Sequence, residues 1–88
     1  MSWYADGHLI WDRTDARSPR WVLLLDGEPG VASWLLDPGD PSIRQDAGTS
    51  QLVHLIRTTL QHAYGHRPRV VTLMPRQYRH RLWFHATF

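Results

Sequence analysis

The stretch TSQLVHLIRTTLQHAYG, residues 49–65, predicts a helix against which the other segments can pack. Its apolar side chains recur every three to four positions, which places them in one stripe: Leu52, Leu55 or Ile56, Thr59 or Leu60, and Ala63 or Tyr64. The hydroxyl of Thr49 or Ser50 can cap the first turn, and Gly65 can end the helix in the left-handed conformation. At about 22 Å, a helix of this length crosses a small sheet.

The residues before this helix predict extended structure. Residues 21–25 and 31–36 are apolar runs, and the Gly- and Pro-containing segment 26–30 between them predicts the turn of a β-hairpin. Residues 3–12 predict a short strand or a small hairpin, because Asp6–Gly7 is a common turn dipeptide. Two further segments carry Pro and Asp and predict surface loops: residues 14–19 and 37–48.

The residues after the helix predict two more strands. Residues 70–74 form a short apolar run suited to a central strand, which Pro75 ends. Residues 77–88 alternate, so their side chains lie on opposite faces: Tyr78, His80, Leu82, Phe84, Ala86 and Phe88 on one, and Arg79, Arg81, Trp83, His85 and Thr87 on the other. The chain is therefore predicted to be a single α+β domain over residues 1–88. Its mainly antiparallel sheet has four to five strands with one helix on one face, in the order β-β-β-α-β-β.

Length and composition exclude several classes of protein. The 88 residues suffice for one domain, and 42% hydrophobic residues with five Trp argue against disorder. The absence of Cys excludes disulfides and Cys-ligated metal sites. The longest apolar run, residues 21–25, is far too short to span a membrane, and the first residues lack the pattern of a signal peptide. We therefore expect a soluble cytoplasmic protein without membrane contact, and the absence of Lys and Asn suggests a GC-rich genome, such as that of a bacterium or its phage.

Charge is distributed unevenly along the chain. Residues 1–46 hold all eight acidic residues and four Arg, a net charge of −4, whereas residues 47–88 hold six Arg and no acidic residue, a net charge of +6. Five of the six His also fall in the second half. Such asymmetry suggests an anionic partner. The alternative is that the fold interleaves the two halves, so that acidic residues of the first neutralise Arg residues of the second.

The outer face of the last strand is the strongest candidate site. Arg79, Arg81, Trp83 and His85 follow one another on this face, about 7 Å apart. Guanidinium groups neutralise phosphates, and an indole offers a flat surface for an unpaired base. Further Arg residues lie nearby in the sequence or on the predicted helix: Arg57, Arg67, Arg69 and Arg76.

Together these eight residues predict a non-catalytic module that binds an anionic partner, either nucleic acid or an acidic protein surface. The plainer interpretation is an ordinary polar strand face, whose Arg and Trp side chains cover the sheet. An interaction module of another class is the main alternative, such as a small inhibitor or adaptor of a phage or mobile element that acts through a Trp-rich apolar surface.

Catalysis is a further alternative. A small metal-independent ribonuclease needs only a general base and a cation for the developing charge, and His80 or His85 beside Arg79 and Arg81 would serve. However, the sequence has no G-x-S-x-G motif and, without Lys, no phosphate-binding loop. Binding is therefore favoured over catalysis.

Three His residues raise the question of a metal site. His54, His62 and His66 are spaced by eight and four residues, which places them near one side of a helix. However, Gly65 is expected to end the helix before His66, and a solvated polar face accounts for all three. We therefore expect neither a metal ion nor a cofactor.

The predicted hairpin is apolar on both sides. Residues 21–25 alternate between two apolar sides: Trp21, Leu23 and Leu25 against Val22 and Leu24. Strands of this kind are normally covered on both sides, but one helix covers only one of them. The second side must be covered by the aromatic residues of segment 3–11 or by another molecule. We therefore expect a symmetric homodimer or another partner interface.

Overall fold

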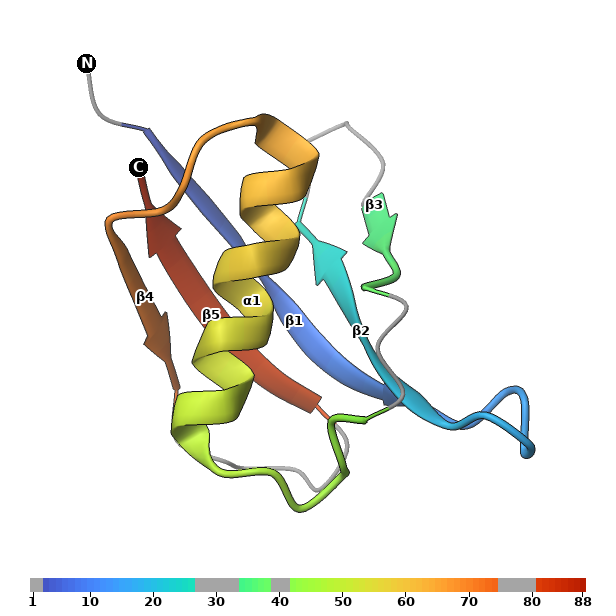
Figure 1. The fold of residues 1–88 in the computed structure, drawn as a ribbon. Helices are drawn as coiled ribbons and strands as arrows, with labels where there is room; N and C mark the ends of the chain where they lie inside the picture. Colours follow the sequence, from blue (N-terminus) through green and yellow to red (C-terminus); the bar gives the residue numbers. More distant parts are fainter. Residues whose placement is uncertain (1–2, 27–33, 39–41, 75–80) are drawn as a thin grey trace.

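Five antiparallel strands and one helix make up the fold in a computed structural model, which describes residues 3–26, 34–38, 42–74 and 81–88. The strand order in the sheet is β3-β2-β1-β5-β4, and the helix lies across one face of the sheet (Figure 1). This arrangement confirms the predicted α+β class and element order. The elements are β1 (Tyr4–Asp12), β2 (Arg20–Leu25), β3 (Trp34–Leu36), α1 (Thr49–Tyr64), β4 (Val70–Leu73) and β5 (Arg81–Thr87).

Strand β1 differs from the prediction of a short strand or hairpin broken at Asp6–Gly7. It is a continuous nine-residue strand, and it lies in the middle of the sheet between β2 and β5. Gly7 is required there for close packing, because a Cβ would lie 2.5 Å from the carbonyl oxygen of Leu24 and 2.8 Å from the ring of Phe84. The glycine that indicated a turn therefore marks a close approach between strands.

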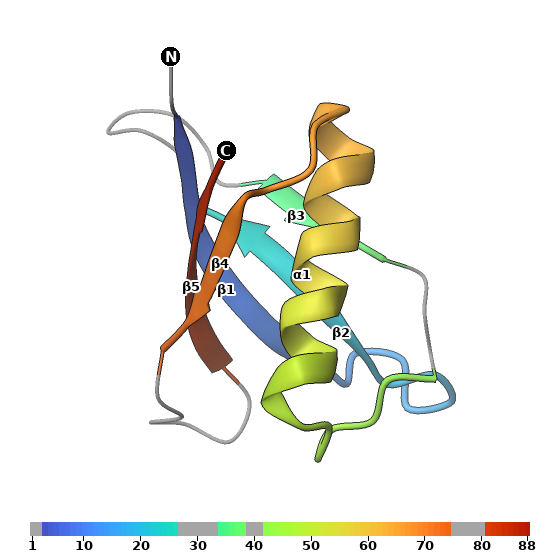
Figure 2. The same cartoon turned by 60° about the vertical axis from the view of Figure 1, so that its left-hand side comes forward.

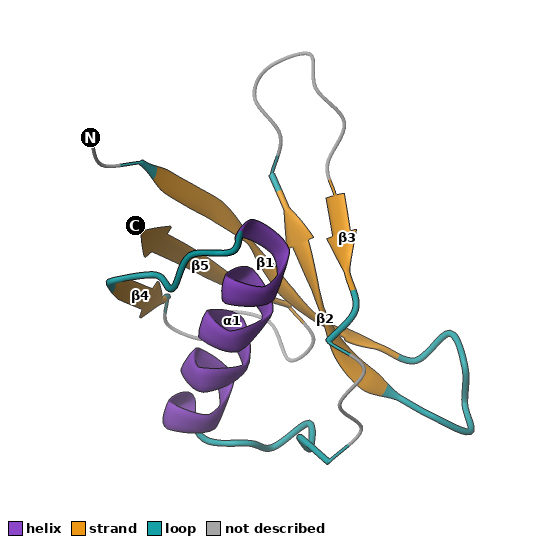
Figure 3. Cartoon of the chain, turned by 45° about the horizontal axis from the view of Figure 1, so that its top comes forward, coloured by secondary structure: helices purple, strands orange, loops and turns teal. Residues whose placement is uncertain are grey.

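The two edges of the sheet are formed by β3 and β4 (Figure 3). Strands β2 and β3 pair antiparallel with Leu23 opposite Leu36, which confirms the predicted hairpin in its described part. Strand β4 was expected to be central, but it pairs only with β5, and Val70 is 55% exposed. The prediction failed because β1 takes the central place. Residues 75–80, the predicted beginning of the last strand, lie outside the described residues.

The helix covers the sheet with the predicted stripe. Its buried residues are Leu52, Leu55, Ile56 and Leu60. Gly65 ends the helix at φ 75°, and its N–H donates to the carbonyl of Gln61 at 2.8 Å, as expected for a left-handed cap. The predicted cap at the beginning was wrong. Gly48 is the N-cap and no side chain caps this end, because Thr49 and Ser50 already belong to the first turn.

The core lies between α1 and the sheet. Leu9, Leu23 and Leu82 line it from three neighbouring strands. Trp21 is also buried there, and its indole N–H donates to the carbonyl of Arg44 at 2.8 Å, which ties the segment before the helix to the core. In the part of the chain that the structure describes, the helix is neither long nor apolar enough to cross a membrane.

Candidate functional site

The side of the sheet that faces away from α1 is called the open face here. No described helix or strand lies on this side (Figure 2). Because Leu9, Leu23 and Leu82 point into the core, their neighbours in the strands point to the open face. Strand pairing then arranges the residues of this face in rows that cross the sheet.

One row, which we call the apolar row, crosses β3, β2, β1 and β5 and continues just past the end of β4. Pairing aligns Leu35 of β3, Leu24 of β2, His8 of β1 and Trp83 of β5. Met74 continues the row, because its N–H donates to the carbonyl of Trp83 at 2.9 Å. Leu35 is 63% exposed and Trp83 is 53% exposed, so the row presents large apolar side chains at its edge and near its middle.

His8 lies at the centre of this row and is almost covered. It is 9% exposed, and its ring meets the indole of Trp83 edge-on, with centroids 4.2 Å apart. Neither ring nitrogen has a hydrogen-bond partner, and Nδ1 lies 3.7 Å from the nearer carboxylate oxygen of Asp26. A buried polar atom without a partner costs about 1–3 kcal/mol, so packing against Trp83 holds this imidazole in place at some expense of stability.

A polar row lies next to the apolar row on one side. It contains Asp6 of β1, His85 of β5 and Thr72 of β4 in register. The Nδ1 atom of His85 is hydrogen-bonded to Oδ1 of Asp6, and the ring of Tyr4 packs beside the imidazole with centroids 5.3 Å apart. An acidic residue of the first half therefore contacts a His residue of the second half, whereas the interleaved alternative called for contacts with its Arg residues.

The predicted site residues do not form one cluster within the described part of the chain. Arg81, Trp83 and His85 do share the open face, as the alternation of the last strand predicted. Arg57, however, projects from α1 in the other layer, where its Nε is buried.

The remaining predicted Arg residues lie elsewhere. Arg67 and Arg69 are exposed between α1 and β4, and the N–H of Arg69 donates to the carbonyl of Thr87 at 2.7 Å. Arg76 and Arg79 lie outside the described residues.

The aromatic residues of segment 3–11 do not cover the open face. Trp3 stacks on Phe88 with centroids 3.9 Å apart and meets Tyr64 of the helix edge-on. Trp11 packs edge-on against buried Trp21 on the same side. Of the three, Tyr4 alone lies on the open face, where it is exposed. Coverage by this segment, one of the two alternatives, is therefore not seen, because the segment is a strand of the sheet.

Sequence reasoning missed the contribution of β1 to this surface. Tyr4, Asp6 and His8 alternate with core residues in the pattern of a half-buried strand. That alternation was the available signal, but Gly7 led to the interpretation of a turn. The residues that surround Trp83 and His85 were therefore not identified.

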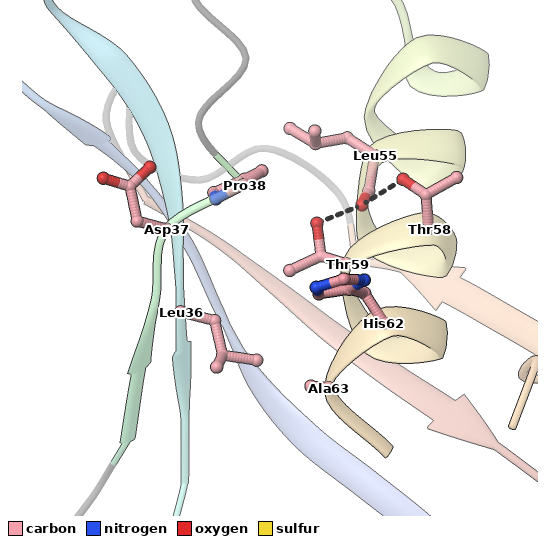
Figure 4. A pocket seen from close by; sticks show the side chains of 8 residues that line it. All are labelled: Leu36, Asp37, Pro38, Leu55, Thr58, Thr59, His62 and Ala63. Atoms are coloured by element: carbon pink, nitrogen blue, oxygen red, sulfur yellow. Dashed lines mark hydrogen bonds between the residues drawn. The ribbon is translucent and has the colours of Figure 1, made fainter. Parts of the chain in front are cut away.

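A hollow of about 400 Å³ lies on the other side of the molecule, between α1 and the segment after β3 (Figure 4). It is lined by Leu36, Asp37, Pro38, Leu55, Thr58, Thr59, His62 and Ala63. The hydroxyls of Thr58 and Thr59 donate to helix carbonyls, at 2.6 Å for Thr59. The Asp37 carboxylate points away from α1 and accepts from Arg20 at 2.7 Å. These side chains are thus engaged within the protein.

The open face combines exposed apolar side chains with charges of both signs on one side of a five-stranded sheet. Such a surface is suited to contact with another large surface more than to enclosure of a small substrate. No family model, curated protein or solved structure matches the chain.

Proposed function

We propose that this chain is a non-catalytic interaction module that binds another protein through the open face of its sheet. One observation carries the proposal. Among the described residues, seven large apolar side chains are exposed, and five of them lie on this face: Tyr4, Leu35, Val70, Met74 and Trp83. Three of them, Leu35, Met74 and Trp83, lie in the apolar row, whereas Tyr4 and Val70 lie beyond the polar row. Several large exposed apolar side chains on one face are typical of a protein interface.

The charges of this face support a protein partner more than a polyanion. Asp6 and Asp26 lie on one side of the apolar row, and Arg81 lies on the other. His85 is already bonded to Asp6. A phosphate backbone would meet both carboxylates, whereas a protein surface can supply groups of either sign.

Trp83 is the expected anchor of the interface. Half of its surface is exposed, and its edge-on contact with His8 limits the orientations of the indole. A rigid aromatic side chain near the centre of a patch contributes much of the binding energy in many interfaces. Truncation of such an anchor typically costs about 2 kcal/mol or more of binding free energy.

Site-specific photo-crosslinking in cells that express the chain tests this proposal. A photo-reactive residue in place of Trp83 should yield a crosslinked protein adduct that nuclease treatment does not remove. The matched control places the same residue at Gln61, which is exposed on the outer side of α1. Absence of a protein adduct at position 83, or equal adducts at both positions, would contradict the proposal.

Anion binding by β5 is the second candidate, and the exposure of Arg81 beside Trp83 favours it. A base would stack on the indole while Arg81 and His85 contact phosphates. Fluorescence anisotropy with a labelled single strand at about 50 mM salt should then show binding. Arg81→Gln should reduce the slope of log K against log salt by about 0.7, whereas Arg17→Gln should not. Absence of binding would eliminate this candidate.

A further inference from the structure

We infer that the partner of the open face is a second copy of this chain, packed face to face about a two-fold axis that follows the apolar row. This inference rests on the proposed function, because it names the protein that the interaction module binds. It assigns a specific contact as well, between Arg81 of one copy and the Asp6–His85 pair of the other.

Strand β2 carries apolar side chains on both of its sides. Its core side carries Leu23 and Leu25, and its open side carries Val22 and Leu24. Val22 is already only 3% exposed within the single chain, so a partner would extend the cover over half-buried Ile10 and Leu24. With Ile10 beside Val22, the middle of the open face has the composition of an inner sheet layer. Two such faces packed together form a sandwich with layers about 10 Å apart.

No described helix or strand lies over the half-buried Ile10 and Leu24 or over the exposed residues of the apolar row. The N-terminal segment, which was the internal candidate, is the central strand β1. The helix is fully occupied with the other face, where its stripe meets the core (Figure 2). A second copy offers a surface of the same size and the same apolar composition.

The charges of the open face are complementary when two copies are related by this axis. Asp6 and Arg81 lie on opposite sides of the apolar row, each about 7 Å from it along the strands. A two-fold axis along the row exchanges these two sides. It therefore brings Arg81 of each copy over the Asp6–His85 pair of the other, and the contact occurs twice. An axis along β1 would instead place Asp6 on Asp6 of the partner subunit, which like charges disfavour.

The amount of exposed apolar surface sets the expected affinity between the two copies. The two exposed aromatic residues and three exposed aliphatic residues can bury several hundred Å² per copy, because an aromatic side chain alone buries about 150–250 Å². This area is somewhat smaller than the roughly 800 Å² that each partner buries in a standard protein interface. We therefore expect a dimer that forms at micromolar concentrations. In its centre the Trp83 side chains of the two copies meet across the axis in an offset stack.

The experiment is sedimentation equilibrium of the full chain from about 1 to 300 μM, a range around the expected dissociation constant. The apparent mass should rise from 10.3 kDa toward twice that value. Trp83→Arg and, independently, Leu35→Arg should keep the chain monomeric. Both side chains are more than half exposed, and circular dichroism will show that each variant is folded.

A charge exchange tests the two-fold geometry. Arg81→Glu and Asp6→Arg should each weaken the dimer about tenfold or more, because each creates like-charge contacts at two places. The double variant restores the pairing in exchanged form, so it should return to within about threefold of the original dissociation constant. Arg67→Glu, which makes the same charge change at an exposed site outside the open face, should have no effect.

The outcomes separate this inference from the proposed function. A mass of 10.3 kDa at every concentration overturns the dimer. If position 83 then still crosslinks to a different protein, the interaction module stands, and if it crosslinks to nothing, both proposals fail. A dimer that Trp83→Arg leaves intact uses another surface and overturns the inference. A dimer that only the face variants dissociate, and that the double variant restores, supports it.

Discussion

At Gly7 the backbone of β1 passes so close to its neighbours that a side chain does not fit. A Cβ would lie 2.5 Å from the backbone oxygen of Leu24, which cannot move without disturbing the β1–β2 pairing. We therefore expect Gly7→Ala to lower the free energy of unfolding by about 1–3 kcal/mol. Gly48→Ala is the matched control, because a Cβ there meets nothing within 4 Å. Urea denaturation will measure both, and equal stability of Gly7→Ala and the original chain would contradict this account.

Tyr64 illustrates how burial of a single hydroxyl affects titration. Its ring lies edge-on to Trp3 and Phe88, and burial raises the pKa of Tyr64 above its ordinary value of 10.0. Because the folded state holds this proton more tightly, the associated stability is complete below the unfolded pKa and is lost as pH rises through the folded one. Ultraviolet titration should show a late tyrosinate phase that Tyr64→Phe removes. Trp3→Ala should shift the phase toward 10.0, and a late phase that persists in Tyr64→Phe would refute the assignment.

A substitution at the beginning of α1 can raise the free energy of unfolding, whereas one at its end lowers it. Gly48 has φ −71° and open space around its Cβ position, and no acidic residue lies in the first turn. Gly48→Asp should therefore supply the missing side-chain cap and raise the free energy of unfolding by about 0.5–1 kcal/mol. Gly65 has φ 75°, so Gly65→Ala should lower it by about 1 kcal/mol. Thermal unfolding of the two variants gives the comparison, and a loss of stability in Gly48→Asp would contradict the assigned cap.

The elements that could be predicted from the sequence are those with a strong local pattern. The helix over residues 49–64 and the pairing of β2 with β3 follow from apolar spacing and from a turn between two adjacent runs. The places of β1 and β4 could not be obtained in this way, because they depend on pairing between the first and the last strand. The local turn preference predicted a turn at Gly7, whereas close packing against Phe84 in the folded sheet explains why a glycine stands there.

The candidate surface also has one part that local periodicity predicts and another that depends on pairing between distant strands. Alternation in residues 81–87 correctly placed Trp83 and His85 on one face, since strand periodicity is local. Their partners come from β1: Asp6 and His85 are 79 positions apart in the sequence. Nothing in the spacing of the Arg residues indicates that Arg57 belongs to the other layer, because that requires the position of the helix relative to the sheet.

In the whole molecule the acidic and basic halves of the chain meet where β1 pairs with β5. The Asp6–His85 contact lies on this seam, whereas Arg20 is bonded to Asp37 within the first half, and that hydrogen bond raises the pKa of Arg20. The two halves also meet where α1 packs on β1 and β2. One side of the sheet packs against α1, and the other is the open face.

The sheet order predicts how protection against hydrogen exchange varies across the molecule. Strand β1 is paired on both sides and carries the fully buried Leu9, so its amides should exchange only on global unfolding. Strand β4 is paired on one side only, and its exposed Val70 adds little packing, so its amides that face away from β5 should exchange by local opening. Exchange measured by NMR at low micromolar concentration will rank the strands. Protection of those β4 amides equal to that of β1 would mean that another strand pairs with this edge, and the sheet would then extend beyond five strands.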